Sequence, residues 1–233
     1  MMEFPYRTAL IVGAGPGISA SLARALRSAG VEVALAARHV EKLKPPAADS
    51  GLHAFAVDAT QHDSVVRLFA AVTERLGDID VVAYNAGARL AGSLVDLDAG
   101  AVERAIAANA MGGFFVAQQA AVRMVPRGHG AILFTGASAS IKGFPNSAAF
   151  AMGKFALRGL AQSAARELGP KGIHVAHFII DGAVRSADRR DPAERPDSTL
   201  DPDAIAQSYL SVLRQPRSAW SQEIDLRPWV ERF

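Results

Sequence analysis

The sequence predicts an α/β protein built on a parallel sheet, and three observations support that fold class. Short apolar segments, partly β-branched, alternate along the chain with segments of helical periodicity that run for ten or more residues. The first apolar segment, TALIV, ends at a cluster of glycines, as a tight strand-to-helix turn does. The chain has 233 residues, half of them hydrophobic, which is enough for one sizeable core.

The elements can be assigned in chain order. Strands are expected at 8–12, 31–37, 53–57, 79–84, 130–135 and 172–180, and helices at 17–29, 63–77, 101–124 and 148–169. Residues 185–203 are rich in charge and proline, which predicts a surface loop before a helix near 203–214 and a last strand within 218–228. No linker divides the sequence, so we expect residues 1–233 to form a single domain.

Composition limits the classes of partner. The formal net charge is only +2, so neither nucleic acid nor an anionic membrane is expected as the main partner. The absence of cysteine excludes disulfides and thiolate metal sites and fits a cytoplasmic protein. The N-terminus MMEFPYRTAL lacks the apolar run of a signal peptide, and no stretch of ~20 apolar residues predicts a membrane span.

The glycine cluster VGAGPGIS follows the first strand and opens the first helix. Gly13, Gly15 and Gly17 lack side chains, so the backbone can turn tightly and approach a ligand closely. The helix start beyond them, at Ile18, offers free N–H groups and a positive dipole end, which suit a pyrophosphate. A tight turn without a ligand is the alternative, but the position in a βαβ unit favours dinucleotide binding.

Two further residues bear on the nucleotide. An NAD site usually has an acidic residue at the end of the second strand, whereas this sequence has Ala37 followed by Arg38. Because an arginine there can pair with a 2′-phosphate, the sequence favours NADP over NAD; a solvated arginine is the alternative. Asp58 closes the third strand and either accepts a hydrogen bond from adenine or caps the helix that follows.

With these residues in place, the chain resembles the short-chain dehydrogenase/reductase family over nearly its whole length. VGAGPGIS is similar to the family motif TGxxxGxG through Gly13 and Gly17, with Val12 and Ser19 as departures. YNAG is similar to the NNAG motif after the fourth strand, and supplies Asn85, Ala86 and Gly87. The segment ELGPKGIHVAH is similar to the approach to the sixth strand.

The resemblance implies a doubly wound Rossmann fold with seven parallel strands, helices on both faces, and a homodimer or homotetramer built on the long central helices. It implies hydride transfer between a nicotinamide and a small carbonyl or alcohol. Asn109 matches the family's helix asparagine, which holds a water of the proton relay. The segment at about 183–203 falls where the family keeps its substrate lid; its arginines could meet an acidic substrate, but a solvated loop is the favoured interpretation.

The family's catalytic YxxxK motif is altered. FAMGK aligns with it, so Lys154 is present and Phe150 replaces the tyrosine that would exchange the substrate proton. The other tyrosines, Tyr6, Tyr84 and Tyr209, have no lysine four residues on. Ala137 stands at the usual serine position, and Ser138 follows it. We therefore expect Lys154 to bind the nicotinamide ribose and, with Asn109, to order a water, while Ser138 polarises a carbonyl.

The sequence offers two alternatives to an NADP-dependent oxidoreductase. The first is a non-catalytic NADP-binding sensor or oligomer partner, which the loss of two catalytic side chains suggests. The second is a hydrolase with Ser138 as nucleophile, which is disfavoured because the G-x-S-x-G elbow is incomplete and no histidine follows Asp181. No metal is expected, since His174 and His177 point to opposite faces of a strand and the other histidines are scattered.

Overall fold

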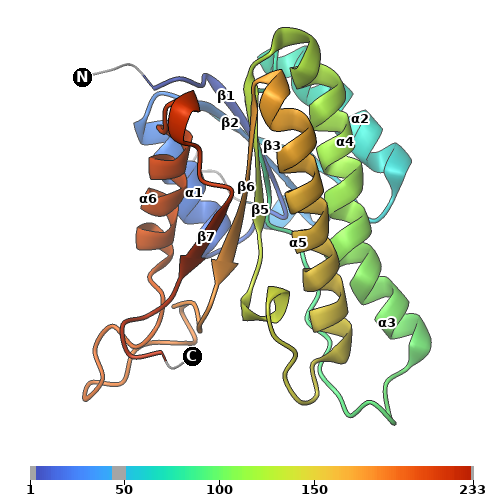
Figure 1. Cartoon of the computed structure of the whole chain (residues 1–233), viewed down its shortest axis with the longest axis vertical. Helices are drawn as coiled ribbons and strands as arrows, with labels where there is room; N and C mark the ends of the chain where they lie inside the picture. The colour runs from blue at the N-terminus through green and yellow to red at the C-terminus, as the bar shows by residue number, and fades with distance from the viewer. Residues whose placement is uncertain (1–3, 44–50, 232–233) are drawn as a thin grey trace.

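The computed structural model describes residues 4–43 and 51–231, and its centre is one parallel sheet (Figure 1). Seven strands pair in the order β3-β2-β1-β4-β5-β6-β7, and every pair is parallel. The strands are Thr8–Val12 (β1), Glu32–Ala37 (β2), Leu52–Ala56 (β3), Val81–Tyr84 (β4), Gly130–Thr135 (β5), Ile173–Ile180 (β6) and Glu223–Leu226 (β7). The predicted fold class is confirmed.

Helices cover both faces of the sheet. They are Ile18–Ser28 (α1), His62–Leu76 (α2), Ala99–Ile106 (α3), Gly112–Met124 (α4), Ala148–Leu168 (α5) and Pro202–Leu213 (α6). α1 and α6 pack on one face, and α2, α4 and α5 pack on the other (Figure 1). Alternate residues of β1 belong to two hydrophobic cores. Leu10 and Val12 face α2, α4 and α5, whereas Ala9 and Ile11 face α1 and α6. Burial on both faces explains why the strand is apolar at every position.

The long helix expected at 101–124 is interrupted. α3 and α4 are separated by a π-helical turn, Ala107–Met111, which carries Asn109. The Asn109 amide donates to the Ala105 carbonyl at 2.8 Å and to the Ala88 carbonyl at 2.7 Å. A side chain that binds the helix backbone in this way displaces the regular ladder, and such turns are often found at functional sites.

The order of the strands creates a crevice at the carboxyl ends of the strands, between β1 and β4. From β1 the chain winds outward through β2 and β3, then returns to begin the other half at β4. The loops after β1 and β4 therefore diverge at the carboxyl end of the sheet, which is where open α/β sheets bind their ligands. The glycine turn follows β1, and Asn85 follows β4 directly.

The segment between β6 and α6 is tied down at both ends. Val184 pairs with Leu200 in a short parallel bridge, and Ser186 pairs with Arg189 in an antiparallel one. The surface loop expected at 185–203 thus has mainly exposed residues but a fixed base, and the helix and strand expected after it are α6 and β7.

The helical stretch Ala99–Arg127 is long and apolar enough, by length and composition, to cross a membrane. This differs from the expectation that no apolar stretch reaches that length. In the fold, its central helix α4 packs Val116, Ala117 and Ala120 into the core between the sheet and α5. The apolar character of this stretch is therefore explained in part by the face of α4 that is buried in the core.

Candidate functional site

The turn after β1 is shaped by two glycines. Gly13 has φ +88°, and a Cβ on it would collide with the backbone of Asn85 and Ala86. Gly17, at φ +85°, precedes the first residue of α1. Only glycine adopts such angles without strain, so the turn lies flat against the end of β4. A Cβ on Gly15 would meet nothing within 4 Å, so this part of the backbone is open to a ligand.

Ser19 stands where the family motif has its last glycine, and it has a structural part in the turn that sequence reasoning missed. Its hydroxyl donates to the Gly13 carbonyl at 3.0 Å. The Asn85 amide in turn donates to the Ser19 hydroxyl at 2.5 Å. The departure from the motif therefore ties the glycine turn, α1 and the end of β4 together.

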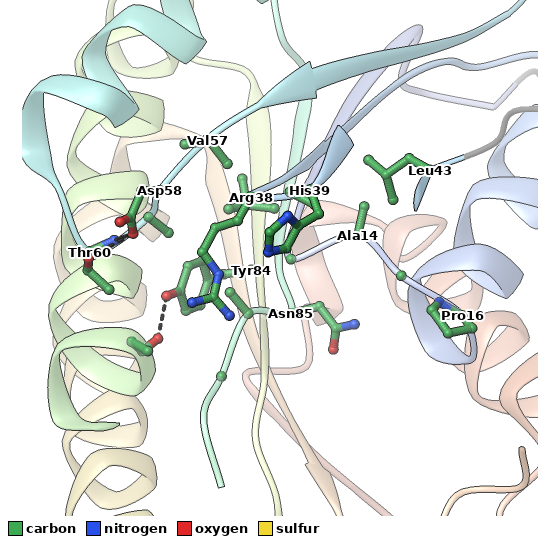
Figure 2. A pocket seen from close by; sticks show the side chains of 18 residues that line it. Ala14, Pro16, Arg38, His39, Leu43, Val57, Asp58, Thr60, Tyr84 and Asn85 are labelled. Atoms are coloured by element: carbon green, nitrogen blue, oxygen red, sulfur yellow. Dashed lines mark hydrogen bonds between the residues drawn. The ribbon is translucent and has the colours of Figure 1, made fainter. Parts of the chain in front are cut away.

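The crevice holds a first cavity of about 340 Å³, which we call the nucleotide cavity (Figure 2). Its lining includes most of the cofactor-binding residues expected from the sequence, namely Gly13, Gly15, Arg38, Asp58, Asn85, Ala86 and Gly87. Gly17 shapes the turn beside it, whereas Ile18 and Lys154 line the adjoining cavity. The residues present thus fit a dinucleotide, because an open glycine turn lines this cavity and the start of α1, at Ile18, lines the adjoining one.

Arg38 and Asp58 both line the nucleotide cavity. Arg38 is exposed and has no hydrogen bond or ion pair with any residue that the structure describes. The neighbouring His39 pairs with Glu41 at 3.2 Å, so that carboxylate is engaged. Asp58 accepts hydrogen bonds from the Thr60 backbone at 3.0 Å and hydroxyl at 2.7 Å (Figure 2). It caps this turn rather than α2, which begins after Gln61.

A second cavity, of about 840 Å³, adjoins the first, and we call it the reaction cavity. Asn85 and Gly87 line both cavities, which therefore meet at the end of β4. Ser138, Phe150 and Lys154 line the reaction cavity, together with residues 183–184 of the segment expected to form a lid. The structure thus brings Ser138 and Lys154 together with Phe150, as the alignment of FAMGK implies.

Lys154 is a buried cation. Its Nζ donates to the Thr135 carbonyl at 2.8 Å, at the end of β5, and lies 5.8 Å from the centre of the Phe150 ring. Burial lowers the pKa of Lys154 to about 8. An ammonium placed like this can bind hydroxyls of a ligand or stabilise a neighbouring anion.

Asn109 lies beneath the reaction cavity rather than in its lining. Its side chain is fully buried, and Oδ1 has no hydrogen-bond partner among the described residues. A Cβ on Gly87 would lie 2.8 Å from Asn109 Oδ1 and 3.6 Å from Lys154 Nζ, so both polar groups face the same glycine. An unpaired buried acceptor beside an ammonium fits an ordered water.

Ala137, Ser140 and His177 lie close to the carboxyl end of β5. Ala137 has no hydroxyl to offer, and Ser140 is buried with its Oγ accepting from the Ala137 N–H at 3.1 Å. Neither ring nitrogen of the buried His177 has a hydrogen-bond partner in the described residues, and the ring fills the space that a side chain at Gly136 would need. Burial lowers the pKa of His177 to about 4, against the opposing effect of Glu223.

The remaining tyrosines do not replace the missing phenol. None lines the reaction cavity. The Tyr84 hydroxyl donates to the Ala108 carbonyl at 2.6 Å, and the Tyr209 hydroxyl is hydrogen-bonded to Thr135 at 2.8 Å. Burial raises the pKa of both, and it raises the pKa of Tyr6 to about 12.

Hydrolase and metal chemistry gain nothing from this geometry. Within residues 4–43 and 51–231, no group of three His, Cys, Asp or Glu side chains could hold a metal ion. His174 stacks on Trp220 at 4.6 Å and pairs with the Ser221 carbonyl at 2.9 Å, away from the reaction cavity. In the same described ranges, Ser138 has no hydrogen bond to a histidine.

Arg89 is a second residue that sequence reasoning missed. It lies two positions beyond the YNAG motif and lines the reaction cavity, with its guanidinium 6.0 Å from the centre of the Phe150 ring. The only signal in the sequence is its closeness to the end of β4.

Comparisons with known proteins agree with this geometry. The family model of the short chain dehydrogenases matches residues 7–194. A short-chain dehydrogenase/reductase of Armillaria gallica is 37% identical over 181 residues, 74% of this chain and 69% of that protein. The crystal structure of a short-chain dehydrogenase from Rhodopseudomonas palustris is 33% identical, with a TM-score of 0.83 over 96% of this chain and 99% of that one. An alcohol dehydrogenase from the archaeon Thermococcus sibiricus, complexed with 5-hydroxy-NADP, is 27% identical, with a TM-score of 0.87 over 97% and 98%.

Proposed function

Because this chain belongs to the short-chain dehydrogenase family of oxidoreductases, we propose that it is an NADP(H)-dependent oxidoreductase with altered proton delivery. The proposed substrate is a small carbonyl, alcohol or related unsaturated compound. The observation that carries the proposal is the buried Lys154, which lies in the reaction cavity where that cavity meets the nucleotide cavity at Gly87. When bound, NADP(H) would supply or accept the hydride.

The preference for NADP rests on Arg38. Arg38 is exposed, lines the nucleotide cavity and is not neutralised by any described carboxylate. The similarity to the Thermococcus sibiricus enzyme, which was solved with an NADP derivative, supports the same cofactor. We expect Arg38→Ala to weaken NADPH binding about 10- to 100-fold, the usual value of a hydrogen bond to a charged group, and to leave NADH binding unchanged.

Fluorescence titration of both cofactors measures this difference. Arg67→Ala is the matched control, because Arg67 is exposed on α2 and lines neither cavity. Equal losses for the two cofactors, or tighter binding of NADH by the unaltered protein, would contradict the assignment of Arg38.

The proton is proposed to arrive without a tyrosine. Lys154 holds the ribose hydroxyls and, with Asn109 Oδ1, orders a water that carries the proton. Ser138, which also lines the reaction cavity, offers a hydroxyl to the substrate oxygen. Phe150 offers no proton donor, so a reaction that releases no alkoxide, such as reduction of an activated alkene or imine, depends less on the missing acid.

A non-catalytic NADP-binding sensor is the second candidate, because Phe150 and Ala137 stand where the family has its acid and its serine. A panel of aldehydes, ketones, imines and activated alkenes, assayed with NADPH, separates the two candidates. Turnover that falls in Lys154→Met supports the oxidoreductase. Tight NADPH binding without turnover of any compound supports the sensor.

We also propose that the chain forms a homodimer or homotetramer through α4 and α5. Exposed apolar side chains on and next to these helices support this: Met111, Phe114, Val122, Met152 and Phe155. Light scattering of the purified protein tests it, and a monomer at micromolar concentration would refute it. The cytoplasmic location and the lid at about 183–203 are further proposals, which cell fractionation and proteolysis with and without NADPH would test.

A further inference from the structure

The reaction cavity has an unusual balance of charge. Three cationic side chains line it, Arg89, Lys154 and Arg189, and no Asp or Glu of the described residues does. Lys154 donates to the Thr135 carbonyl and is committed to the cofactor in the proposed function. Two arginines therefore remain for the substrate.

Arg89 is free to bind an anion. Its side chain is exposed, and it makes no hydrogen bond or ion pair with any residue in 4–43 or 51–231. Its one described contact is with the Phe150 ring, at 6.0 Å from the ring centre. A guanidinium next to an aromatic wall keeps its fork of N–H donors available for a planar anion.

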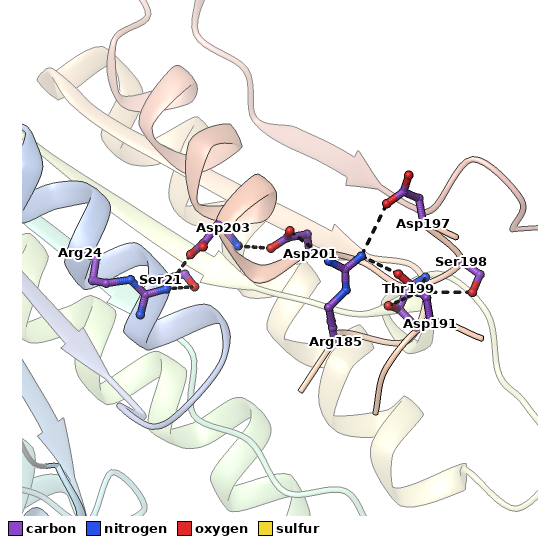
Figure 3. Close-up of polar contacts among 9 residues, drawn as sticks. All are labelled: Ser21, Arg24, Arg185, Asp191, Asp197, Ser198, Thr199, Asp201 and Asp203. Carbon is purple, nitrogen blue, oxygen red and sulfur yellow. Dashed lines mark hydrogen bonds and ion pairs between the residues drawn. The ribbon is translucent and has the colours of Figure 1, made fainter. Parts of the chain in front are cut away.

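Arg185 and Arg189 lie in the same loop but differ in their ion pairs. The Arg185 guanidinium is taken up by Asp191 at 2.6 Å, by Asp201 at 3.4 Å and by Asp197 at 3.6 Å (Figure 3). Arg189 has no such partner among the described side chains and lines the reaction cavity, while its backbone pairs with Ser186. The carboxylates of the loop thus neutralise one arginine and leave the other for a ligand.

The nearest buried carboxylate does not cancel this charge. Asp181 lies behind the lining residues Ile180 and Gly182, and it is flanked by Lys142 at 3.9 Å and Arg227 at 3.7 Å. These two cations balance the charge of Asp181. The cavity therefore keeps a net positive lining where the substrate would stand.

We infer that the substrate is a small organic anion whose carboxylate is bound by Arg89 and Arg189 and whose apolar body packs against Phe150 and Phe144. This inference rests on the proposed function. In the direction of reduction, the carbonyl carbon of the substrate gains a hydride from NADPH, its oxygen gains a proton from water, and NADP⁺ and an alcohol are formed. The carboxylate takes no part in the bond changes and serves recognition alone.

The test compares two substrates that differ only in charge, para-formylbenzoate and its methyl ester, with NADPH at low and high salt. We expect kcat/KM for the acid to exceed that for the ester at least tenfold at low salt, and the ratio to shrink as salt screens the exposed arginines. Arg89→Met and Arg189→Met should each lower kcat/KM for the acid about 10-fold or more, a larger fall than for the ester, so that the ratio drops. Arg190→Met is the matched control, because Arg190 is the exposed neighbour that does not line the cavity.

Equal kcat/KM for acid and ester, or a ratio that survives both substitutions, overturns the inference and leaves the oxidoreductase standing. If neither aldehyde is turned over, the proposed function fails for this reaction. The inference is then tested by measuring the binding of a carboxylate directly. Calorimetry with benzoate and methyl benzoate on the NADP⁺-loaded protein should then show benzoate binding that Arg89→Met weakens about 10-fold or more. No preference for benzoate would overturn it.

Discussion

Restoring the missing phenol is the sharpest test of how this protein moves a proton. In Phe150→Tyr, a hydroxyl is added to a ring whose centre lies 5.8 Å from Lys154 Nζ and 6.0 Å from the Arg89 guanidinium. We expect the variant to reduce aldehydes roughly 10²- to 10⁴-fold faster than the natural chain, which is the usual contribution of a positioned general acid.

The magnitude follows from the charge on Lys154. A phenolate about 4–5 Å from an ammonium gains roughly 3–4 kcal/mol at an effective dielectric constant near 20. Since about 1.4 kcal/mol corresponds to one pKa unit, the phenol would fall from about 10 to about 7–8, before burial offsets part of the shift. An acid with a pKa in that range donates efficiently near neutral pH.

Initial rates of NADPH oxidation with one aldehyde, measured from pH 6 to pH 9, give both the gain and the new pKa. Phe155→Tyr is the matched control, because it adds the same hydroxyl on α5 outside both cavities. The double variant Phe150→Tyr with Lys154→Met should lose the gain. If Phe150→Tyr binds NADPH normally and reduces aldehydes no faster than Phe155→Tyr, the placement of a proton donor at this wall is wrong.

Three further predictions concern stability. Because burial lowers the pKa of His177 to about 4 from the ordinary 6.5, the unfolded chain binds more protons between these values. Stability should therefore fall by about 2 kcal/mol from pH 7 to pH 5 in urea unfolding, and His177→Gln should lack that component. Gly13→Ala should lower the free energy of unfolding by roughly 3 kcal/mol or more, because its Cβ would collide with Ala86. Gly17→Ala should lower it by only about 1–2 kcal/mol, because Gly17 has a similar positive φ but open space around it. Equal losses in the two variants would contradict the packing argument. Lys154→Met should raise the free energy of unfolding by about 1–2 kcal/mol below pH 8. The difference should shrink as the pH rises and vanish above pH 10.5, where the amine of the natural chain is neutral in the folded and the unfolded state.

The parts of the fold that could be predicted are those that depend on the residues of one short segment alone. TALIV is apolar at each position because both faces of β1 are buried, and the glycines after it are demanded by backbone angles. The break at Asn109 could not be foreseen, because it depends on the Ala88 carbonyl, which lies 21 positions earlier in the chain.

The candidate site shows the same division. Arg38 and Lys154 stand at motif positions, and they line the nucleotide cavity and the reaction cavity respectively. Arg185 and Arg189 look equivalent in the sequence, four residues apart in one charged loop. Only the fold reveals that three aspartates surround the first, while the second borders the reaction cavity. Charge in a loop therefore becomes informative only once its partners are known.

The energetic cost of burying Lys154 indicates why the sequence has the lysine of the YxxxK motif without its tyrosine. Lowering the pKa of a lysine from its ordinary 10.5 to about 8 corresponds to a cost of roughly 3 kcal/mol near neutral pH. Among the described residues, Lys154 makes one hydrogen bond, to the Thr135 carbonyl, and finds no carboxylate that would neutralise it. A residue that only packed α5 against β5 would be better served by methionine or leucine. The buried cation therefore indicates a ligand with hydroxyls or negative charge at this point, and this supports cofactor binding even where the tyrosine has been lost.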